Sequence, residues 1–346
     1  MDLTTHLPPD TSGTLDEALE RLHSFGPERG GWLSNHAPMA VEALVRHGGG
    51  PGVHRWLDRY REKLEDMPAP AAEVTPENWQ GALGDPRRIA DWAVYFERET
   101  AGRAWREVLA EWWPRLLPGI AAGATHPVIR VGHSVRTLLG APETAPRVTE
   151  LAHALGYWAA RHQPLPPLSS LAPAADAAAA LDAVAPVPDQ RGGIRGRLDQ
   201  LTAFPRWPGR AFTDPDGARD RLEELVRAAT HRYAAYGYGE PIMLVHAATA
   251  PNAVLRALPA LPRELWAPSL GAAWAASAAV TAAYSPPRPS EHRAATGGLS
   301  PEDVFARAAA HGDDHTIKFT DTALDVGDPA ALAAAVHSVE LNPPAF

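Results

Sequence analysis

The sequence predicts a mostly α-helical protein that folds as one large domain, and three observations support this prediction. Alanine, leucine, arginine and glutamate, which all favour helices, are abundant in the composition. Runs of β-branched residues are rare, and apolar residues recur mainly at helical spacing. The 346 residues suffice for one large domain or two smaller ones, and no firm boundary divides them. We therefore expect a single helical domain over residues 1–346.

The first two helices have recognisable beginnings and ends. The first opens with Thr14 and Glu17 at capping-box spacing, repeats leucine at helical spacing and stops at Gly26. The second is predicted to start at an N-cap formed by Ser34 or Asn35 and to end in a glycine run. The glycine-rich stretch "RHGGGPGVHRW" that follows predicts a loop.

A tryptophan-rich section follows these helices. Asp85 and Pro86 occupy cap and first-turn positions of a helix whose residues Trp92, Tyr95 and Phe96 share one face. An aromatic stripe at this spacing is typical of core packing.

The middle of the chain contains two further helices and a segment of different composition. Thr125 is the predicted N-cap of a helix that Gly140 stops, and the next helix runs to the proline cluster "QPLPPL". The segment 169–192 is rich in alanine and proline and poor in bulky apolar residues. It predicts a long surface loop within the domain.

Helical patterns continue towards the C-terminus. Residues 216–237 form an amphipathic pattern, and residues 242–245 favour either a buried helix or a short strand. The small-residue stretch 265–285 predicts a closely packed helix, because its alanine and serine are too weakly apolar for a membrane span.

Charge and composition exclude several classes of function. The net charge of −9 argues against a nucleic-acid or anionic-membrane partner and favours a small, uncharged or hydrophobic ligand. The chain has no cysteine, which excludes disulfides, thiolate metal sites and cysteine nucleophiles. Residues 1–10 have neither the basic nor the apolar region of a signal peptide, so we expect a cytoplasmic protein. No glycine-rich nucleotide-binding fingerprint is present.

Histidines supply the candidate functional groups. Each one alone is more often a core or cap residue than a ligand, but a helix bundle can gather a metal site by pointing ligands inward from several helices. Six of the 15 histidines stand in apolar or small-residue surroundings, at the starts or on the inner faces of predicted helices: His36, His126, His133, His246, His311 and His315.

A lysine in "HGDDHTIKF" adds a further candidate. The chain has 32 basic residues, and only Lys63 and Lys318 are lysines. If this stretch is one helix, Lys318 shares a face with His315 and His311. Burial and a neighbouring cation lower a lysine pKa, and a neutral amine can take up carbon dioxide as a carbamate, which arginine cannot do. The alternative is a lysine that pairs with Asp313 or Asp314.

Five ordered motifs resemble a known family. The motifs "SNHAPM", "GATHPVIRVGH", "ALGYWAARHQPLP", "LVHAATAPNAVLRALPALP" and "DDHTIKF" are similar to those of the questin oxidase-like family. The resemblance runs from about residue 15 to residue 325. It implies an enzyme of aromatic polyketide metabolism that oxidatively opens an anthraquinone ring, as a Baeyer–Villiger-type oxidase or a dioxygenase.

One branch of that family uses a mononuclear non-haem iron held by four histidines and a carboxylated lysine. Carried over by motif, the resemblance implies an Fe(II) site between helices, with a carboxylated lysine as the fifth ligand. The implied ligands are His36, His126, His246, His315 and Lys318. His133, His311 and Asp314 are expected beside the ligands or in the substrate pocket.

The resemblance also implies the reacting partners, an aromatic polyketide and dioxygen. Four imidazoles and one carbamate leave one octahedral position on iron, so we expect the substrate to bind beside the metal. Arg130 is a candidate catalytic residue that stabilises phenolate or peroxide charge. Trp32, Tyr157 and Trp158 are candidates to line an aromatic slot, with core packing as the alternative.

Two other functions stay open from the sequence. One is an NADPH-assisted, metal-independent monooxygenase of the Baeyer–Villiger type in which the histidines act as acids and bases; NADPH is also a candidate external reductant for the iron enzyme. The other is a non-catalytic protein that binds a hydrophobic aromatic metabolite. Metal content and turnover separate these functions.

Overall fold

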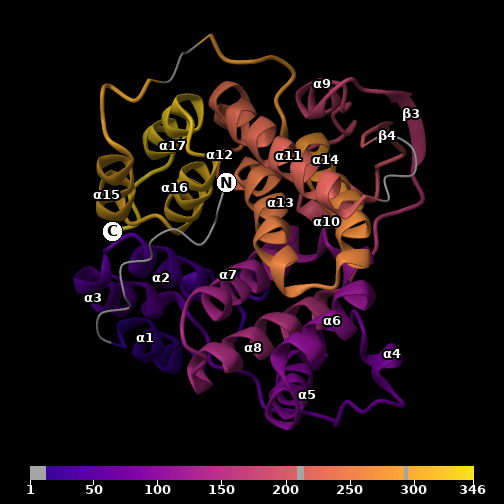
Figure 1. Cartoon of the computed structure of the whole chain (residues 1–346), viewed down its shortest axis with the longest axis vertical. Helices are drawn as coiled ribbons and strands as arrows, with labels where there is room; N and C mark the ends of the chain where they lie inside the picture. Colours follow the sequence, from indigo (N-terminus) through magenta and orange to yellow (C-terminus); the bar gives the residue numbers. More distant parts are fainter. Residues whose placement is uncertain (1–12, 209–213, 292–294) are drawn as a thin grey trace.

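A computed structural model of the chain describes residues 13–208, 214–291 and 295–346 (Figure 1). Helices account for most of these residues, and the strands are few and short, so the predicted mostly α fold is confirmed. The expectation about residues 1–10 lies outside the described part. Among the described helices, none has the combination of length and apolar character that a bilayer crossing requires.

The N-terminal half consists mainly of helices, with one small hairpin. Its elements are α1 (Thr14–Leu22), β1 (Glu28–Arg29), β2 (Leu33–Ser34), α2 (Ala37–Arg46), α3 (Gly50–Tyr60), α4 (Trp79–Ala82), α5 (Ile89–Gly102), α6 (Trp105–Leu116), α7 (His126–Gly140) and α8 (Ala145–Arg161). The two strands pair antiparallel.

The C-terminal half has the same helical character. Its elements are β3 (Ser169–Pro173), α9 (Ala177–Asp182), α10 (Ile194–Leu198), β4 (Ala203–Arg206), α11 (Pro215–Tyr236), α12 (Pro241–Leu244), α13 (His246–Ala257), α14 (Trp266–Tyr284), α15 (Pro301–His311), α16 (Asp314–Val326) and α17 (Pro329–Leu341). Strands β3 and β4 pair in parallel.

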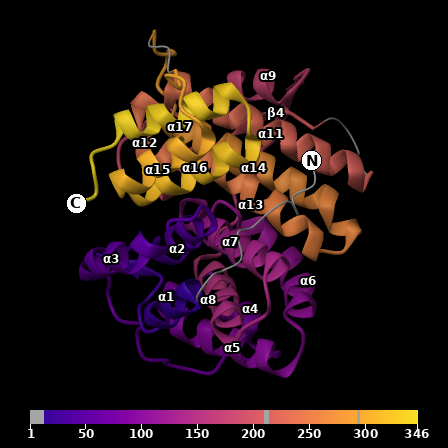
Figure 2. The same ribbon diagram turned by 60° about the vertical axis from the view of Figure 1, so that its left-hand side comes forward.

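The two halves form neighbouring groups of helices that meet along α2, α7, α13 and α16 (Figures 1 and 2). Helix α7 packs against α13, and α2 packs against α16. At the crossing of α7 and α13, a Cβ atom added to Gly132 would lie 2.5 Å from the Cα of Ala253. Only glycine permits so close an approach of two helix backbones.

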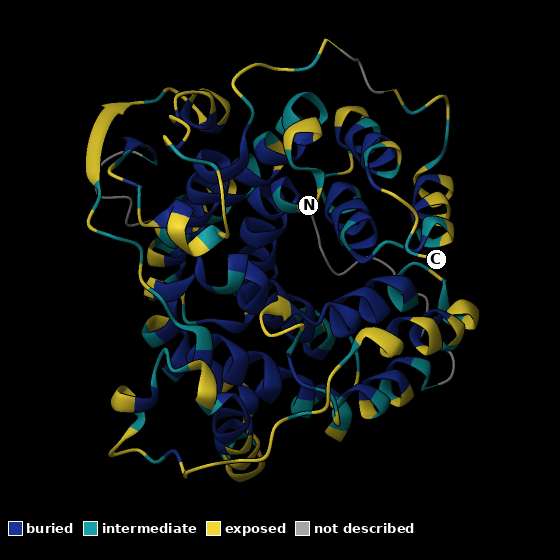
Figure 3. Ribbon diagram, turned by 180° about the vertical axis from the view of Figure 1, so that it is seen from behind, coloured by how far each residue is buried: buried dark blue, intermediate teal, exposed yellow. Residues whose placement is uncertain are grey.

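A continuous apolar core extends through both halves, from Met39 to Ala334 in the chain, and the interior is largely buried (Figure 3). Trp92, Tyr95 and Phe96 of α5 are all buried, with Trp112 of α6 against them in edge-to-face contacts. This aromatic stripe therefore packs in the core, as its spacing indicated.

Two local predictions about loops were wrong. "RHGGGPGVHRW" is not a loop, because α3 begins at Gly50 within it. The segment 169–192 is not a loop throughout, since it contains β3 and α9. The condition that "HGDDHTIKF" forms one helix is not met: Gly312 ends α15 in a left-handed conformation, with φ of 80°. Asp313 then caps α16 by accepting a hydrogen bond from the backbone N–H of Thr316 at 2.8 Å.

Two predicted helix starts also differ from those observed. The N-cap of α1 is Gly13, and Thr14 is already the first helical residue. The N-cap of α2 is His36, while the side-chain oxygen of Asn35 accepts a hydrogen bond from the N–H of Ala37 at 3.0 Å. The shift places the imidazole of His36 at the beginning of its helix. The predicted bounds of α7 and of α11 agree with the structure to within a residue.

Candidate metal centre

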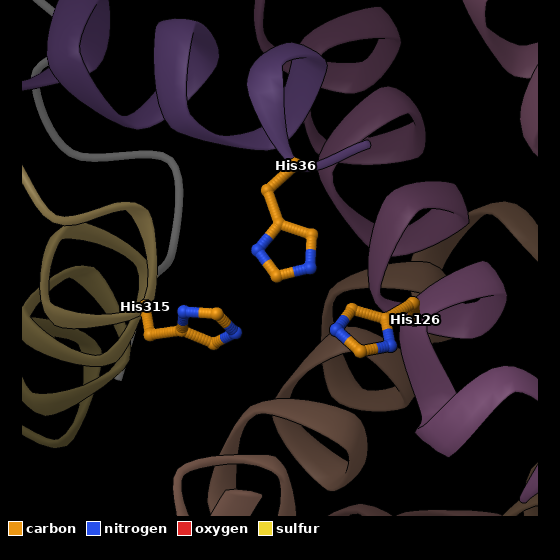
Figure 4. A group of neighbouring side chains, drawn as sticks. All are labelled: His36, His126 and His315. Atoms are coloured by element: carbon orange, nitrogen blue, oxygen red, sulfur yellow. The ribbon is translucent and has the colours of Figure 1, made fainter. Parts of the chain in front are cut away.

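Four histidines from four helices bring their rings together where the two halves of the fold meet, and Figure 4 shows three of them, His36, His126 and His315. The ring of His36 lies 4.5 Å from that of His126 and 4.3 Å from that of His315, measured between centroids. His246 lies 4.3 Å from His126 and 5.6 Å from His315. Ligand nitrogens of His36, His126 and His315 all lie within 4.8 Å of one another, a spacing that allows one metal ion to reach all three.

Each of these histidines lies at the N-terminal end of its helix. His36 is the N-cap of α2, His126 and His246 are the first residues of α7 and α13, and His315 is the second residue of α16. The N-termini of helices carry partial positive charge from their unpaired N–H groups. Four such ends around one point favour neutral imidazoles and stabilise an anion placed between them.

Backbone carbonyls fix the tautomers of His126 and His246. The Nδ1 of His126 lies 2.5 Å from the carbonyl oxygen of Gly123, and that of His246 lies 3.0 Å from the carbonyl oxygen of Met243. A carbonyl only accepts, so Nδ1 carries the proton in both rings and Nε2 keeps its lone pair. Both Nε2 atoms are buried and have no hydrogen-bond partner among the described residues. A buried lone pair without a donor is what a metal ligand requires before the metal binds.

The carbonyl that orients His126 comes from a strained turn. Gly123, Ala124 and Thr125 are consecutive residues in the left-handed region, with φ of 52°, 55° and 68°. This conformation costs an L-residue about 1–2 kcal/mol, and it is least favourable for a β-branched residue such as threonine. Backbone strain of this kind concentrates at functional sites, where the surrounding structure maintains it.

Asp314 orients the other two histidines. A single oxygen of its carboxylate, Oδ1, lies 2.6 Å from Nδ1 of His36 and 2.8 Å from Nδ1 of His315. Both imidazoles therefore donate from Nδ1 to one ionised acceptor, which leaves Nε2 of each ring free. Asp314 was predicted beside the ligands, and the structure places it between the two histidines whose rings it orients.

Lys318 is buried beside these groups, with 1% of its surface exposed. Its Nζ lies 3.2 Å from Nδ1 of His36, a nitrogen whose proton already points to Asp314. No carboxylate in the described ranges lies within ion-pair distance of Nζ, so the alternative in which Lys318 forms an ion pair with Asp313 or Asp314 lacks support. Burial lowers the pKa of Lys318 to about 8, although Asp314 opposes the shift. About a tenth of the amine is then uncharged at pH 7, far more than for an ordinary lysine.

Burial and mutual repulsion keep three of the imidazoles neutral. Burial lowers the pKa of His36 to about 3, and it places the pKa values of His126 and His246 well below the ordinary range. His315 differs: burial would lower its pKa, but Asp314 outweighs this effect and raises it. The pKa of Asp314 itself is well below its usual value, because its histidine partners outweigh the cost of burying the charge.

Two further histidines and Arg130 do not join this group. His133 donates from Nδ1 to Glu42 at 2.7 Å, and His311 lies at the end of α15 with Nε2 3.0 Å from the carbonyl oxygen of Asn342. The guanidinium of Arg130 forms a two-point ion pair with Glu150, with a second contact of 2.7 Å. A buried carboxylate of α8 thus neutralises the charge of Arg130, and the catalytic role predicted for this residue stays a prediction.

The aromatic slot predicted for Trp32, Tyr157 and Trp158 is also not formed. Trp32 is 62% exposed in the β1–β2 turn. Trp158 lies in the core and donates to the carbonyl of Gly119 at 3.2 Å. Of the three, only Tyr157 approaches the centre, because its hydroxyl lies near the strained Gly123.

A buried charge network that was not predicted from the sequence lies about two to three turns farther along the same four helices. Arg136 of α7 pairs with Glu42 of α2 and with Asp321 of α16, and Arg256 of α13 pairs with Asp321 at 2.6 Å. Each of these residues follows the histidine of its own helix by six or ten positions. The sequence shows this spacing, but it does not show which residue of another helix each one contacts. The network ties together all four helices that supply the imidazoles.

Part of this network has the composition of a second metal site. Ligand atoms of Glu42, His133 and Asp321 lie within 4.8 Å of one another. Arg136 contacts both carboxylates, and Arg256 contacts Asp321 and lies 3.3 Å from Nε2 of His133. Two guanidinium cations thus fill the space beside these groups and neutralise the carboxylates that a metal dication would need. We therefore infer that this cluster positions the four helices and does not bind a metal.

The fold and the four-histidine centre define a helical protein with a buried, nitrogen-rich site. Residues 33–180 match the family model described as Questin oxidase-like, so the resemblance predicted from the motifs is confirmed over this range. The matched range contains His36 and His126. The description of that family model names an oxidase. No curated protein matches the chain.

Proposed function

We propose that the protein is a non-haem iron oxygenase that inserts oxygen into an anthraquinone-like aromatic polyketide and opens one of its rings. The observation that supports this most directly is the pair of buried Nε2 atoms on His126 and His246, which have lone pairs and no donor. The match to the Questin oxidase-like family supplies the substrate class and the oxidative chemistry.

The residues present fit a resident metal. His36, His126, His246 and His315 offer four imidazoles, and imidazole suits iron among other first-row metals. Lys318 in its carboxylated form offers an oxygen anion as the fifth ligand. Bound Fe(II) supplies a redox-active position for dioxygen that no side chain of this chain provides.

The protein groups around the centre prepare it for an anion. The four helix N-termini contribute partial positive charge, and Asp314 is a buried carboxylate that lies at hydrogen-bond distance from two of the ligands, His36 and His315. A carbamate on Lys318 balances a metal dication together with Asp314. The same helix ends stabilise a deprotonated phenol next to the metal, because they favour negative charge.

Metal analysis of the purified protein, prepared without chelators, tests the proposal. We expect about one iron per chain, and loss of this iron in His126→Ala and in His246→Ala. His311→Ala is the matched control, because that imidazole belongs to the same sequence motif as His315 but points to Asn342. Iron should persist in this variant.

Dioxygen consumption with an anthraquinone substrate tests the activity. We expect uptake that follows the iron content and a product of opened ring, identified by mass spectrometry. Full turnover by metal-free protein with NADPH would instead support the metal-independent monooxygenase. Tight substrate binding without any oxygen uptake by the iron-loaded protein would support the non-catalytic binding protein.

A further inference from the structure

A second cavity lies at the opposite ends of α2 and α7 from the histidine centre. Its volume is about 480 Å³, and its lining includes Arg46, the last residue of α2, and Gly140, the last residue of α7. His36 is the N-cap of α2, and His126 is the first residue of α7. A helix of ten residues is about 15 Å long, so the cavity and the centre are separate places in the fold.

Arg46 has no partner in this cavity. Its Nε is buried without a hydrogen-bond acceptor, and within the described ranges no carboxylate lies at ion-pair distance from its guanidinium. Burial and the nearby Arg136 lower the pKa of Arg46, although Asp321, Asp325 and Glu42 oppose the shift. A buried donor without an acceptor costs about 1–3 kcal/mol. Such a cost is recovered when a ligand supplies the acceptor.

The other charged groups of the lining are already paired. Arg136 contacts Glu42, and Arg147 contacts Asp16 at 2.6 Å. Arg136 also pairs with Asp321 and lies 3.7 Å from Asp325, and both carboxylates attract Arg46 from a distance. Arg46 is thus the lining arginine that has no direct ion pair among the described residues, and a carboxylate would supply one without the double charge of a phosphate.

Two other features describe the remainder of the ligand. Leu15 and Val45 contribute apolar surface to the lining. Thr144, at the N-cap of α8, has a buried hydroxyl that has no partner among the described residues and forms no side-chain cap. The cavity thus has the volume of a small-molecule site, an apolar part and two unused polar groups.

We propose that this cavity binds a small organic carboxylate, with the acid paired to the guanidinium of Arg46 and the apolar body lying against Leu15 and Val45. Arginine and carboxylate form two parallel hydrogen bonds, which gives the pairing its directional preference. The site is independent of the proposed iron chemistry, since none of its residues belongs to the histidine centre.

Calorimetric titration with 2-naphthoate and with the neutral 2-naphthamide tests the proposal. We expect the acid to bind and the amide to bind at least about 10-fold more weakly. Arg46→Gln should weaken 2-naphthoate about 10- to 100-fold, the range expected when charge-assisted hydrogen bonds are lost. Arg263→Gln, which removes a half-exposed arginine paired with Asp216, should bind as the wild type does.

Three outcomes would overturn the proposal: no binding of 2-naphthoate at millimolar concentration, equal binding of acid and amide, or unchanged affinity in Arg46→Gln. Metal content is measured on the same samples. Arg46→Gln should retain the metal content of the wild type, which separates a lost carboxylate site from damage to the histidine centre. Loss of the metal together with the carboxylate would show that Arg46 acts on the whole fold and would also overturn the proposal.

Discussion

Replacement of Asp314 probes the histidine centre most directly, because one of its oxygens orients two imidazoles. The hydrogen bonds of 2.6 and 2.8 Å to His36 and His315 are charge-assisted, and the carboxylate is 8% exposed, so solvent screens them little. Removing a hydrogen-bond partner of a metal-ligating histidine typically lowers metal affinity 10- to 100-fold. Since Asp314 serves two ligands, we expect its complete loss to fall at the upper end of this range.

Two substitutions separate the charge of Asp314 from its hydrogen bonds. Asp314→Asn keeps an oxygen acceptor and loses the charge, and we expect metal affinity about 10-fold weaker, or about 1.4 kcal/mol. Asp314→Leu removes both, and we expect about 100-fold weaker binding, or about 2.7 kcal/mol. Both variants have an intact set of four imidazoles and Lys318.

Competition with a chelator of known affinity measures these changes, and urea unfolding of the metal-free variants measures stability separately. Asp328→Asn is the matched control, because Asp328 caps α17 and pairs with His231 instead of the four ligands, and asparagine caps a helix equally well. This control should bind metal as the wild type does. Wild-type affinity in Asp314→Leu would refute the idea that Asp314 orients two ligands.

Three other expectations follow from buried groups. Lys318→Arg should lose oxygenase activity and iron, since arginine forms no carbamate. Lys318→Ala should lose both as well and regain part of them with added propionate. Full activity of Lys318→Arg would contradict the proposal that Lys318 is carboxylated. Burial lowers the pKa of His23 to about 4. Between about pH 6.5 and pH 4 this imidazole is therefore neutral in the folded protein but protonated in the unfolded chain. The free energy of unfolding should therefore fall by about 2 kcal/mol between pH 7 and pH 5 because of His23 alone. Urea unfolding of His23→Gln should show a decrease over this pH range that is smaller by that amount. Equal decreases in the wild type and in His23→Gln would refute this. Gly132→Ala should destabilise the protein by about 1–3 kcal/mol, because the added methyl group would clash where α7 contacts α13. Gly271→Ala should be neutral or stabilising, because a Cβ atom there meets open space. Thermal unfolding measures both, and a less stable Gly271→Ala than Gly132→Ala would contradict this packing.

Much of the helical architecture was predictable from local chemistry. The bounds of α7 followed from the proline after His126 and from the glycine that ends the helix, and those of α11 followed from its amphipathic period. Helix periodicity and caps depend on neighbours three or four residues away, which a single sequence contains. Two of the differences arose where a glycine has two uses: Gly50 starts α3, while Gly312 interrupts the stretch around His315.

The candidate site was predictable only in part. Spacing and family motifs pointed to His36, His126, His246 and His315, and the structure brings their rings together. Spacing also placed Arg130 on one face with His126, but it could not show that a glutamate of the next helix takes the guanidinium. Residue types that suit a site also suit an ion pair, and only the partner distinguishes these roles.

The sequence by itself determined which side chains each helix carries and which of them lie at its N-terminal end. It also determined that any metal ligands must be nitrogen or oxygen, because the chain has no cysteine. The tertiary structure alone decided which helices meet and how each is rotated about its axis. Asp314 reaches His36 across 278 residues of sequence, and Arg136 reaches Asp321 across 185. Periodicity fixes the relative direction of two side chains on one helix, but the packing of the other helices determines what each side chain contacts.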